Sequence, residues 1–154
     1  MLSTGTGRRR DAMVRPMRPL ATLILLAWLI GGLLLTLQPA HPLPGRVVDD
    51  NLVPFHTLQI YLDNLGSEFW MRNLLGNLLL LLPLGLLGPI SLPVLNRWWR
   101  IAMVAVLFSV AIELIQLVVP DRSADIDDVI VNVAGALLGY AILVALNLPG
   151  RRYS

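Results

Sequence analysis

The chain has 154 residues, of which 56% are hydrophobic and only 14% are charged. Soluble domains carry about 25% charged residues, so this composition indicates one compact integral membrane protein. Cysteine is absent and the two histidines share one polar segment, so we expect neither a disulfide nor a metal site built from thiolates or histidines, and we assign no metal and no cofactor. All twelve basic residues are arginines that flank apolar stretches, which favours a role in membrane topology over a nucleic-acid partner.

Four stretches are long and apolar enough to cross a bilayer, which takes about 20 residues. They cover residues 19–38, 73–95, 101–119 and 129–148. The sequence therefore predicts an all-α membrane protein with four transmembrane helices. In this interpretation residues 1–18 are a basic N-terminal segment, 19–148 the membrane domain and 149–154 a short tail. We interpret the first stretch as an uncleaved signal anchor, because its apolar core is longer than that of a usual signal peptide.

Arginine placement predicts the orientation of these helices. If the helices alternate in direction, nine arginines fall on one side of the membrane, and eight of the ten acids fall on the other side. Arginine-rich segments stay in the cytoplasm, so we expect both termini to be cytoplasmic and both acidic loops to face outward.

The first outward loop contains a second helical pattern. Leu58, Tyr61, Leu62 and Leu65 follow the i, i+3, i+4, i+7 spacing of an amphipathic helix. We expect this short helix to lie on the outer membrane surface.

One carboxylate interrupts the third apolar stretch. Glu113 lies about 10 Å below the outer end of that stretch, at about 1.5 Å per residue. A carboxylate at this depth is costly unless it is paired, neutral or hydrated, so it is a candidate functional residue. Ser109 and Gln116 share its helix face.

The neighbouring stretches place more polar residues in the same leaflet. Asn73 and Asn77 share a face of the second stretch, and Asp128 and Asn132 share a face of the fourth. We predict an outward-facing polar pocket that binds a ligand through Asn73, Asn77, Glu113, Gln116, Arg122, Asp125, Asp128 and Asn132. The pair Gly135 and Gly139 allows close helix packing, which we assign to contacts within the chain; the oligomeric state is left open.

Several chemistries fit this set. Glu113 is either ionised beside Arg122 or protonated in a dry pocket. Arg122 has the geometry to hold a phosphate or a carboxylate, and the acids at 125, 127 and 128 could coordinate a divalent cation. Structural roles compete with these: a Glu113–Arg122 ion pair, acids that cap the fourth helix, and asparagines that join helices.

Four segments together resemble the VanZ-like family of bacterial membrane proteins. They are residues 51–55 (NLVPF), 73–85 with its Asn73 and Pro83, 109–116 with Glu113 and Gln116, and 122–140 with its acids and glycines. The matching segments lie within residues 50–142. This resemblance implies a multi-pass protein of the bacterial cytoplasmic membrane with a cell-envelope role, in a family linked to resistance to the glycopeptide teicoplanin.

Three functions remain open at this point. The favoured one is a non-catalytic protein that binds a membrane lipid headgroup or a lipid-linked envelope precursor. The second is an intramembrane enzyme acting on lipid headgroups, whose catalytic candidates are Glu113 as general base and Arg122 as phosphate clamp. The third is a proton-coupled exporter, which the one-sided placement of polar residues disfavours, because transport sites lie near the membrane midplane.

Overall fold

The computed structural model describes residues 17–38, 50–120 and 122–146, and most of these residues are helical. In chain order they are α2 (Met17–Thr36), α3 (His56–Asp63), α4 (Glu68–Ser91), the 3₁₀ helix η1 (Pro93–Leu95), α5 (Trp98–Gln116) and α6 (Ile126–Ala145). Helices α2, α5 and α6, and residues 71–91 of α4, are each long and apolar enough to cross a membrane. The predicted all-α fold with four spans and one additional short helix is therefore confirmed.

The predicted boundaries differ from the observed ones where the chain turns. Helix α4 ends at Ser91 rather than at residue 95, because Leu92 is extended before Pro93 and the next three residues form η1. Helix α5 ends at Gln116 rather than at 119, and α6 begins at Ile126 rather than at 129. Residues 1–16, 39–49, 121 and 147–154 lie outside the described residues. They include most of the basic segment 1–18, the last two residues of the predicted fourth span and the whole tail 149–154.

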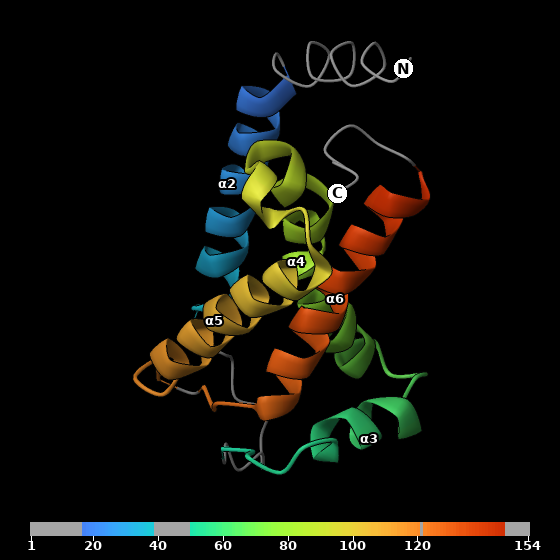
Figure 1. Cartoon of the computed structure of the whole chain (residues 1–154). Helices are drawn as coiled ribbons and strands as arrows, with labels where there is room; N and C mark the ends of the chain where they lie inside the picture. Colours follow the sequence, from blue (N-terminus) through green and yellow to red (C-terminus); the bar gives the residue numbers. More distant parts are fainter. Residues whose placement is uncertain (1–16, 39–49, 121, 147–154) are drawn as a thin grey trace, which may run out of the picture.

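Helix α4 is the centre of the bundle. It packs against α2 and α6, and α5 packs mainly on α6 (Figure 1). Leu81 of α4, Ile101 of α5 and Leu143 of α6 are fully buried. Helix α3 lies across the end of the bundle where α5 ends and α6 begins (Figure 1), and that end is called the α3 end below.

Glycines bring the backbones of α4 and α6 into direct contact. A Cβ atom added at Gly135 or Gly139 would overlap the carbonyl oxygens of Leu78 or Leu82, and one at Gly85 would overlap that of Ala136. Small residues permit such close approach between membrane helices. The prediction that Gly135 and Gly139 pack within the chain is confirmed.

Helix α2 is the peripheral wall of the bundle. Only Ala21 and Leu25 are buried in it, so most of its apolar side chains remain for contact with lipid. The indole Nε1 of Trp28 donates a 3.2 Å hydrogen bond to the carbonyl oxygen of Leu80 in α4. This bond fixes one point of contact between the two helices.

The short helix α3 confirms that the first loop contains a helix, but only part of the predicted apolar face is covered. Tyr61 is buried and Leu58 is half-buried, whereas Leu62 is exposed and Leu65 lies beyond the end of the helix. The helix packs on the first turns of α4 and α6. Its position on the membrane surface stays a prediction.

Candidate functional site

Glu113 is buried, and its carboxylate is hydrogen-bonded to the backbone of the α5–α6 connection. Its side chain is 7% exposed, and Oε2 accepts a 2.7 Å hydrogen bond from the backbone N–H of Asp125. The Nε of Arg122 donates instead to the carbonyl oxygen of Gln38, at 2.9 Å. The ion pair between Glu113 and Arg122 is therefore not formed among the described residues.

Asp125 holds the start of α6 and the segment before α3. Its Oδ1 accepts hydrogen bonds of 2.9 Å from the backbone N–H of Asp127 and from Nδ2 of Asn51. The first bond is an N-cap of α6, so the capping role considered for the acidic cluster is confirmed for Asp125. The backbone of Asn51 also pairs with both neighbours of Asp125, because its N–H donates to Ala124 and its carbonyl accepts from Ile126.

The side chain of Asp127 accepts hydrogen bonds at the start of α3, as that of Asp125 does at the start of α6. The Asp127 side chain is completely buried, and its two oxygens accept from the backbone N–H groups of Phe55, at 2.6 Å, and Leu58, at 3.0 Å. These donors lie at the N-terminus of α3, where the first N–H groups have no partner within the helix. Phe55 itself adopts the left-handed backbone conformation, with φ of 69°.

Asn132 joins two helices in the interior. Its Nδ2 donates a 2.8 Å hydrogen bond to Oγ of Ser109 in α5, and both side chains are at most 1% exposed. This geometry matches the interhelical role that the sequence allowed for Asn132.

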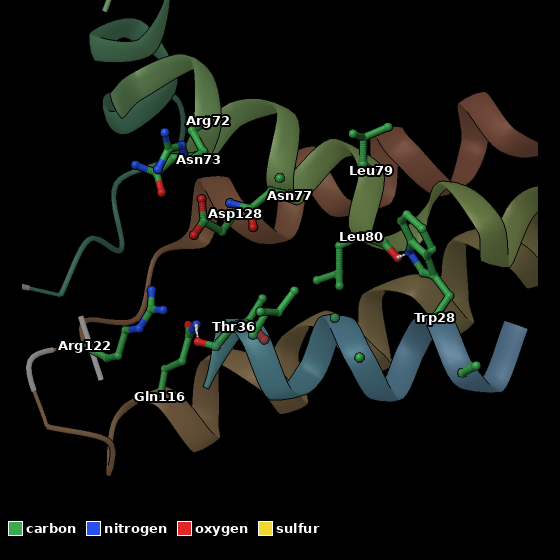
Figure 2. A pocket seen from close by; sticks show the side chains of 15 residues that line it. Trp28, Thr36, Arg72, Asn73, Asn77, Leu79, Leu80, Gln116, Arg122 and Asp128 are labelled. Carbon is green, nitrogen blue, oxygen red and sulfur yellow. Dashed lines mark hydrogen bonds between the residues drawn. The ribbon is translucent and has the colours of Figure 1, made fainter. Parts of the chain in front are cut away.

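A cavity of about 610 Å³ lies between α2 and α4. Its walls come from the facing sides of the two helices, and Gln116, Arg122 and Asp128 complete it at the α3 end (Figure 2). The lining residues are Ala27, Trp28, Gly31, Gly32, Leu35, Thr36, Arg72, Asn73, Gly76, Asn77, Leu79, Leu80, Gln116, Arg122 and Asp128. Below, this space is called the α2–α4 cavity.

The α2–α4 cavity is polar at one end and apolar at the other. Figure 2 shows Arg72, Asn73, Arg122 and Asp128 gathered at one end, while Trp28 lies at the opposite end beside Leu79 and Leu80. The space between the ends exists because glycines line it. A Cβ atom at Gly31 or Gly76 would meet nothing within 4 Å.

Hydrogen bonds close the polar end of the cavity on the side of α2. Nε2 of Gln116 donates to the carbonyl oxygen of Thr36 at 3.2 Å, and Arg122 donates to that of Gln38. Thr36 is the last residue of α2, where carbonyl groups lack partners within the helix. Together with the Trp28–Leu80 bond, these contacts tie α2 to the bundle on both sides of its glycines.

Other polar groups of the cavity remain available to a ligand. The side chains of Arg72 and Asn77 make no hydrogen bond or ion pair with any described residue. Asp128 faces the hydroxyl of Tyr61, which donates to its Oδ1 across 3.5 Å. Asn73 donates only locally, through Nδ2 to the carbonyl of Phe69.

The structure divides the eight predicted ligand-binding residues into three places. Five of them line the α2–α4 cavity: Asn73, Asn77, Gln116, Arg122 and Asp128. Glu113 and Asp125 line a separate, mostly apolar cavity of about 310 Å³ with Val110, Leu114 and Val129 among its walls. Asn132 is buried between α5 and α6. The three acids at 125, 127 and 128 likewise face different partners rather than one common point.

Ten of the fifteen residues that line the cavity were missing from the sequence-based set, Arg72 and Trp28 among them. Arg72 precedes Asn73 and shares a helix face with Gly76, a spacing that could have included it, but it was counted only for topology. Trp28 lies in a uniformly apolar stretch, where no pattern distinguishes the face that meets α4.

Comparison with known proteins gives one match. The family model described as VanZ/LLP1 matches residues 20–147, which cover all four long helices. No curated protein matches the chain, and no solved structure matches it. Because the match extends over most of the sequence and four helices are able to span a membrane, this multi-pass membrane protein belongs to the VanZ/LLP1 family.

Proposed function

We propose that the protein binds a membrane lipid, or a lipid-linked envelope precursor, in the α2–α4 cavity. The observation that carries this proposal is the division of the cavity into a polar and an apolar end between two membrane helices. A lipid has the same division, with a polar headgroup joined to apolar chains. The volume of about 610 Å³ falls within the usual range of small-molecule sites, about 300–1,000 Å³.

The proposal places the polar end of the cavity in the outer leaflet of the bacterial cytoplasmic membrane. Its support is the arginine distribution, which predicts cytoplasmic termini and therefore an outward α3 end. Arg72 and Arg122 would then meet headgroups near the outer surface, while Trp28 would lie deeper among the chains.

A cell-envelope role follows from this placement. A protein that holds a lipid-linked wall precursor in the outer leaflet would change how much precursor reaches the cell surface. We extend the proposal to glycopeptide susceptibility on the basis of the family resemblance alone, with teicoplanin as the compound to test.

The geometry supports binding better than the two other functions considered. The enzymatic alternative needs Glu113 and Arg122 at one substrate, but they line separate cavities, and the Glu113 carboxylate accepts from the Asp125 N–H. The exporter also relied on Glu113 as the site shared by proton and substrate. Neither function has a specific observation in its favour.

Mass spectrometry of co-purified lipids tests the proposal. The variants Gly31→Leu and Gly76→Leu place a side chain in the cavity, where an added Cβ meets no atom within 4 Å. We expect the wild-type protein to retain a lipid that both variants lose. The control is Gly66→Leu, because Gly66 has the same open surroundings but lies in the exposed turn before α4. Equal lipid content in wild type, Gly31→Leu and Gly76→Leu would contradict the proposal.

A further inference from the structure

Two arginines from separate elements face the polar end of the α2–α4 cavity. Arg72 belongs to the second turn of α4, and Arg122 to the connection between α5 and α6; Figure 2 shows them on opposite sides of that end. Arg72 makes no ion pair with any described residue, and toward the described residues Arg122 uses only its Nε, in the bond to Gln38. Most of their N–H donors are thus available.

Such an arrangement favours an anion between the two side chains. Guanidinium groups present paired donors that match the oxygens of a phosphate, and charge-assisted hydrogen bonds are stronger than neutral ones. The amides of Asn73 and Asn77 add neutral donors at the same end. Two arginines face the single carboxyl group of Asp128 at this end, so positive charge is in excess there in either protonation state of Asp128.

The apolar part of the cavity indicates what the anion is attached to. Among the lining residues, Gly31 comes between Thr36 and Trp28 along α2, and Gly76 comes between Asn73 and Leu79 along α4, so the space continues past both glycines. At its apolar end the Trp28–Leu80 bond crosses between the helices (Figure 2). A free inorganic anion would make no use of this part. An apolar chain would remain in contact with Leu79 and Leu80 while its polar group stayed at the arginines.

We infer that the α2–α4 cavity takes a phosphate ester carried on an apolar chain, with the phosphate between Arg72 and Arg122 and the chain along Gly76 and Gly31. This inference rests on the proposed lipid-binding function and adds the chemical class of the headgroup. Glycerophospholipids and polyprenyl phosphates share this chemistry, and the experiment below separates these two sources.

The test is a titration of the purified full-length protein, followed by native mass spectrometry. The probes are phosphatidylglycerol, a polyprenyl phosphate, inorganic phosphate, and diacylglycerol with the same chains as the phosphatidylglycerol but no phosphate. We expect at least one lipid phosphate to bind about tenfold or more tightly than diacylglycerol, the effect of one charge-assisted hydrogen bond or more. Whichever of the two lipid phosphates binds more tightly identifies the class of lipid that supplies the phosphate.

Three variants connect the preference to the arginines. Arg72→Gln should remove most of the preference for phosphate, and Arg122→Lys should reduce it while keeping the positive charge. Arg100→Gln is the matched control, because Arg100 contacts the Val94 carbonyl and the Trp99 ring near the opposite end of the bundle, and it should leave the preference unchanged. Melting curves confirm that each variant remains folded.

The outcomes distinguish this inference from the proposed function. If diacylglycerol and both lipid phosphates bind equally and Gly76→Leu abolishes all three, the lipid site stands and the phosphate clamp is wrong. If inorganic phosphate binds as tightly as the lipid phosphates, the chain assignment is wrong. If no lipid binds in a manner sensitive to Gly76→Leu, the proposed function itself fails.

Discussion

Asp127, in the first turn of α6, accepts a 2.6 Å hydrogen bond from the backbone N–H of Phe55, the residue that precedes α3. Its second oxygen accepts from Leu58, so one buried carboxylate from another helix caps α3. Residues 51–55 and the acidic residues at 125 and 127 are therefore joined by hydrogen bonds into one structural unit.

Replacing Asp127 should loosen α3. Asp127→Ala leaves two N–H groups without their acceptors, and we expect a loss of about 1–3 kcal/mol in the free energy of unfolding. Asp127→Asn keeps one acceptor oxygen and should lose less. Thermal unfolding in detergent measures the difference, with Asp63→Asn, an exposed acid in the last turn of α3, as control. Equal melting temperatures for Asp127→Ala and the control would refute the capping role.

Glu113→Ala should reduce stability rather than lipid binding. The substitution leaves the Asp125 N–H without an acceptor near the start of α6, at a cost of about 1–3 kcal/mol. Glu113→Gln retains an acceptor oxygen and should lie between Glu113→Ala and wild type. Unfolding curves and the co-purified lipid are measured on the same samples. Loss of the lipid in a stable Glu113→Gln protein would show that Glu113 belongs to the ligand site after all.

The glycines of α4 and α6 should respond in opposite ways to a methyl group. Gly139→Ala places a Cβ against the Leu82 carbonyl and should cost about 1–3 kcal/mol through overpacking. Gly76→Ala adds the same methyl group in open space and should be neutral or slightly stabilising, since alanine favours helix more than glycine does. Comparison of the two melting temperatures checks this contrast, and equal values would contradict the close contact of α4 with α6.

Ser109 and Asn132 should be coupled energetically. Double-mutant cycles of hydrogen bonds between membrane helices average about 0.6 kcal/mol, and we expect a coupling of that size or somewhat larger because both side chains are buried. The cycle compares wild type, Ser109→Ala, Asn132→Leu and the double variant. Strictly additive losses would mean that the hydrogen bond contributes nothing to stability.

The predicted orientation is open to direct labelling, because the chain contains no cysteine of its own. A cysteine introduced at Gln59, which is exposed in α3, should react with an impermeant maleimide on intact cells. A cysteine introduced at Ser154 should react only after the membrane is permeabilised. The reverse pattern would place the polar end of the α2–α4 cavity in the cytoplasmic leaflet.

The sequence was sufficient to predict the parts of the fold that depend on composition and period. The four spans follow from the length of their apolar runs, and α3 follows from the spacing of Leu58 and Tyr61. The packing of Gly139 followed from small-residue spacing, and the backbone contact with α4 confirms it. These features follow from the spacing of residues within one helix, and they do not require knowing which helix packs against it.

The separation of Glu113 from the α2–α4 cavity could not be predicted in the same way. Helical phase places Glu113 and Gln116 on one face of α5, yet Gln116 reaches the end of α2 and Glu113 reaches the backbone of Asp125. That difference depends on how the α5–α6 connection folds back, which no periodicity encodes. The role of α2 as a wall of the α2–α4 cavity could not be predicted from the sequence either, because apolar residues occupy every side of this helix.

The cap supplied by Asp127 also has a consequence for biosynthesis. Phe55 and Asp127 are separated by 72 residues, and two membrane spans lie between them in the chain. When α3 leaves the ribosome, the carboxylate that completes its N-terminus has not yet been synthesised. The final docking of α3 must therefore wait until the last span has been inserted, so α3 is expected to be among the last elements of the protein to acquire protection from proteolysis during assembly.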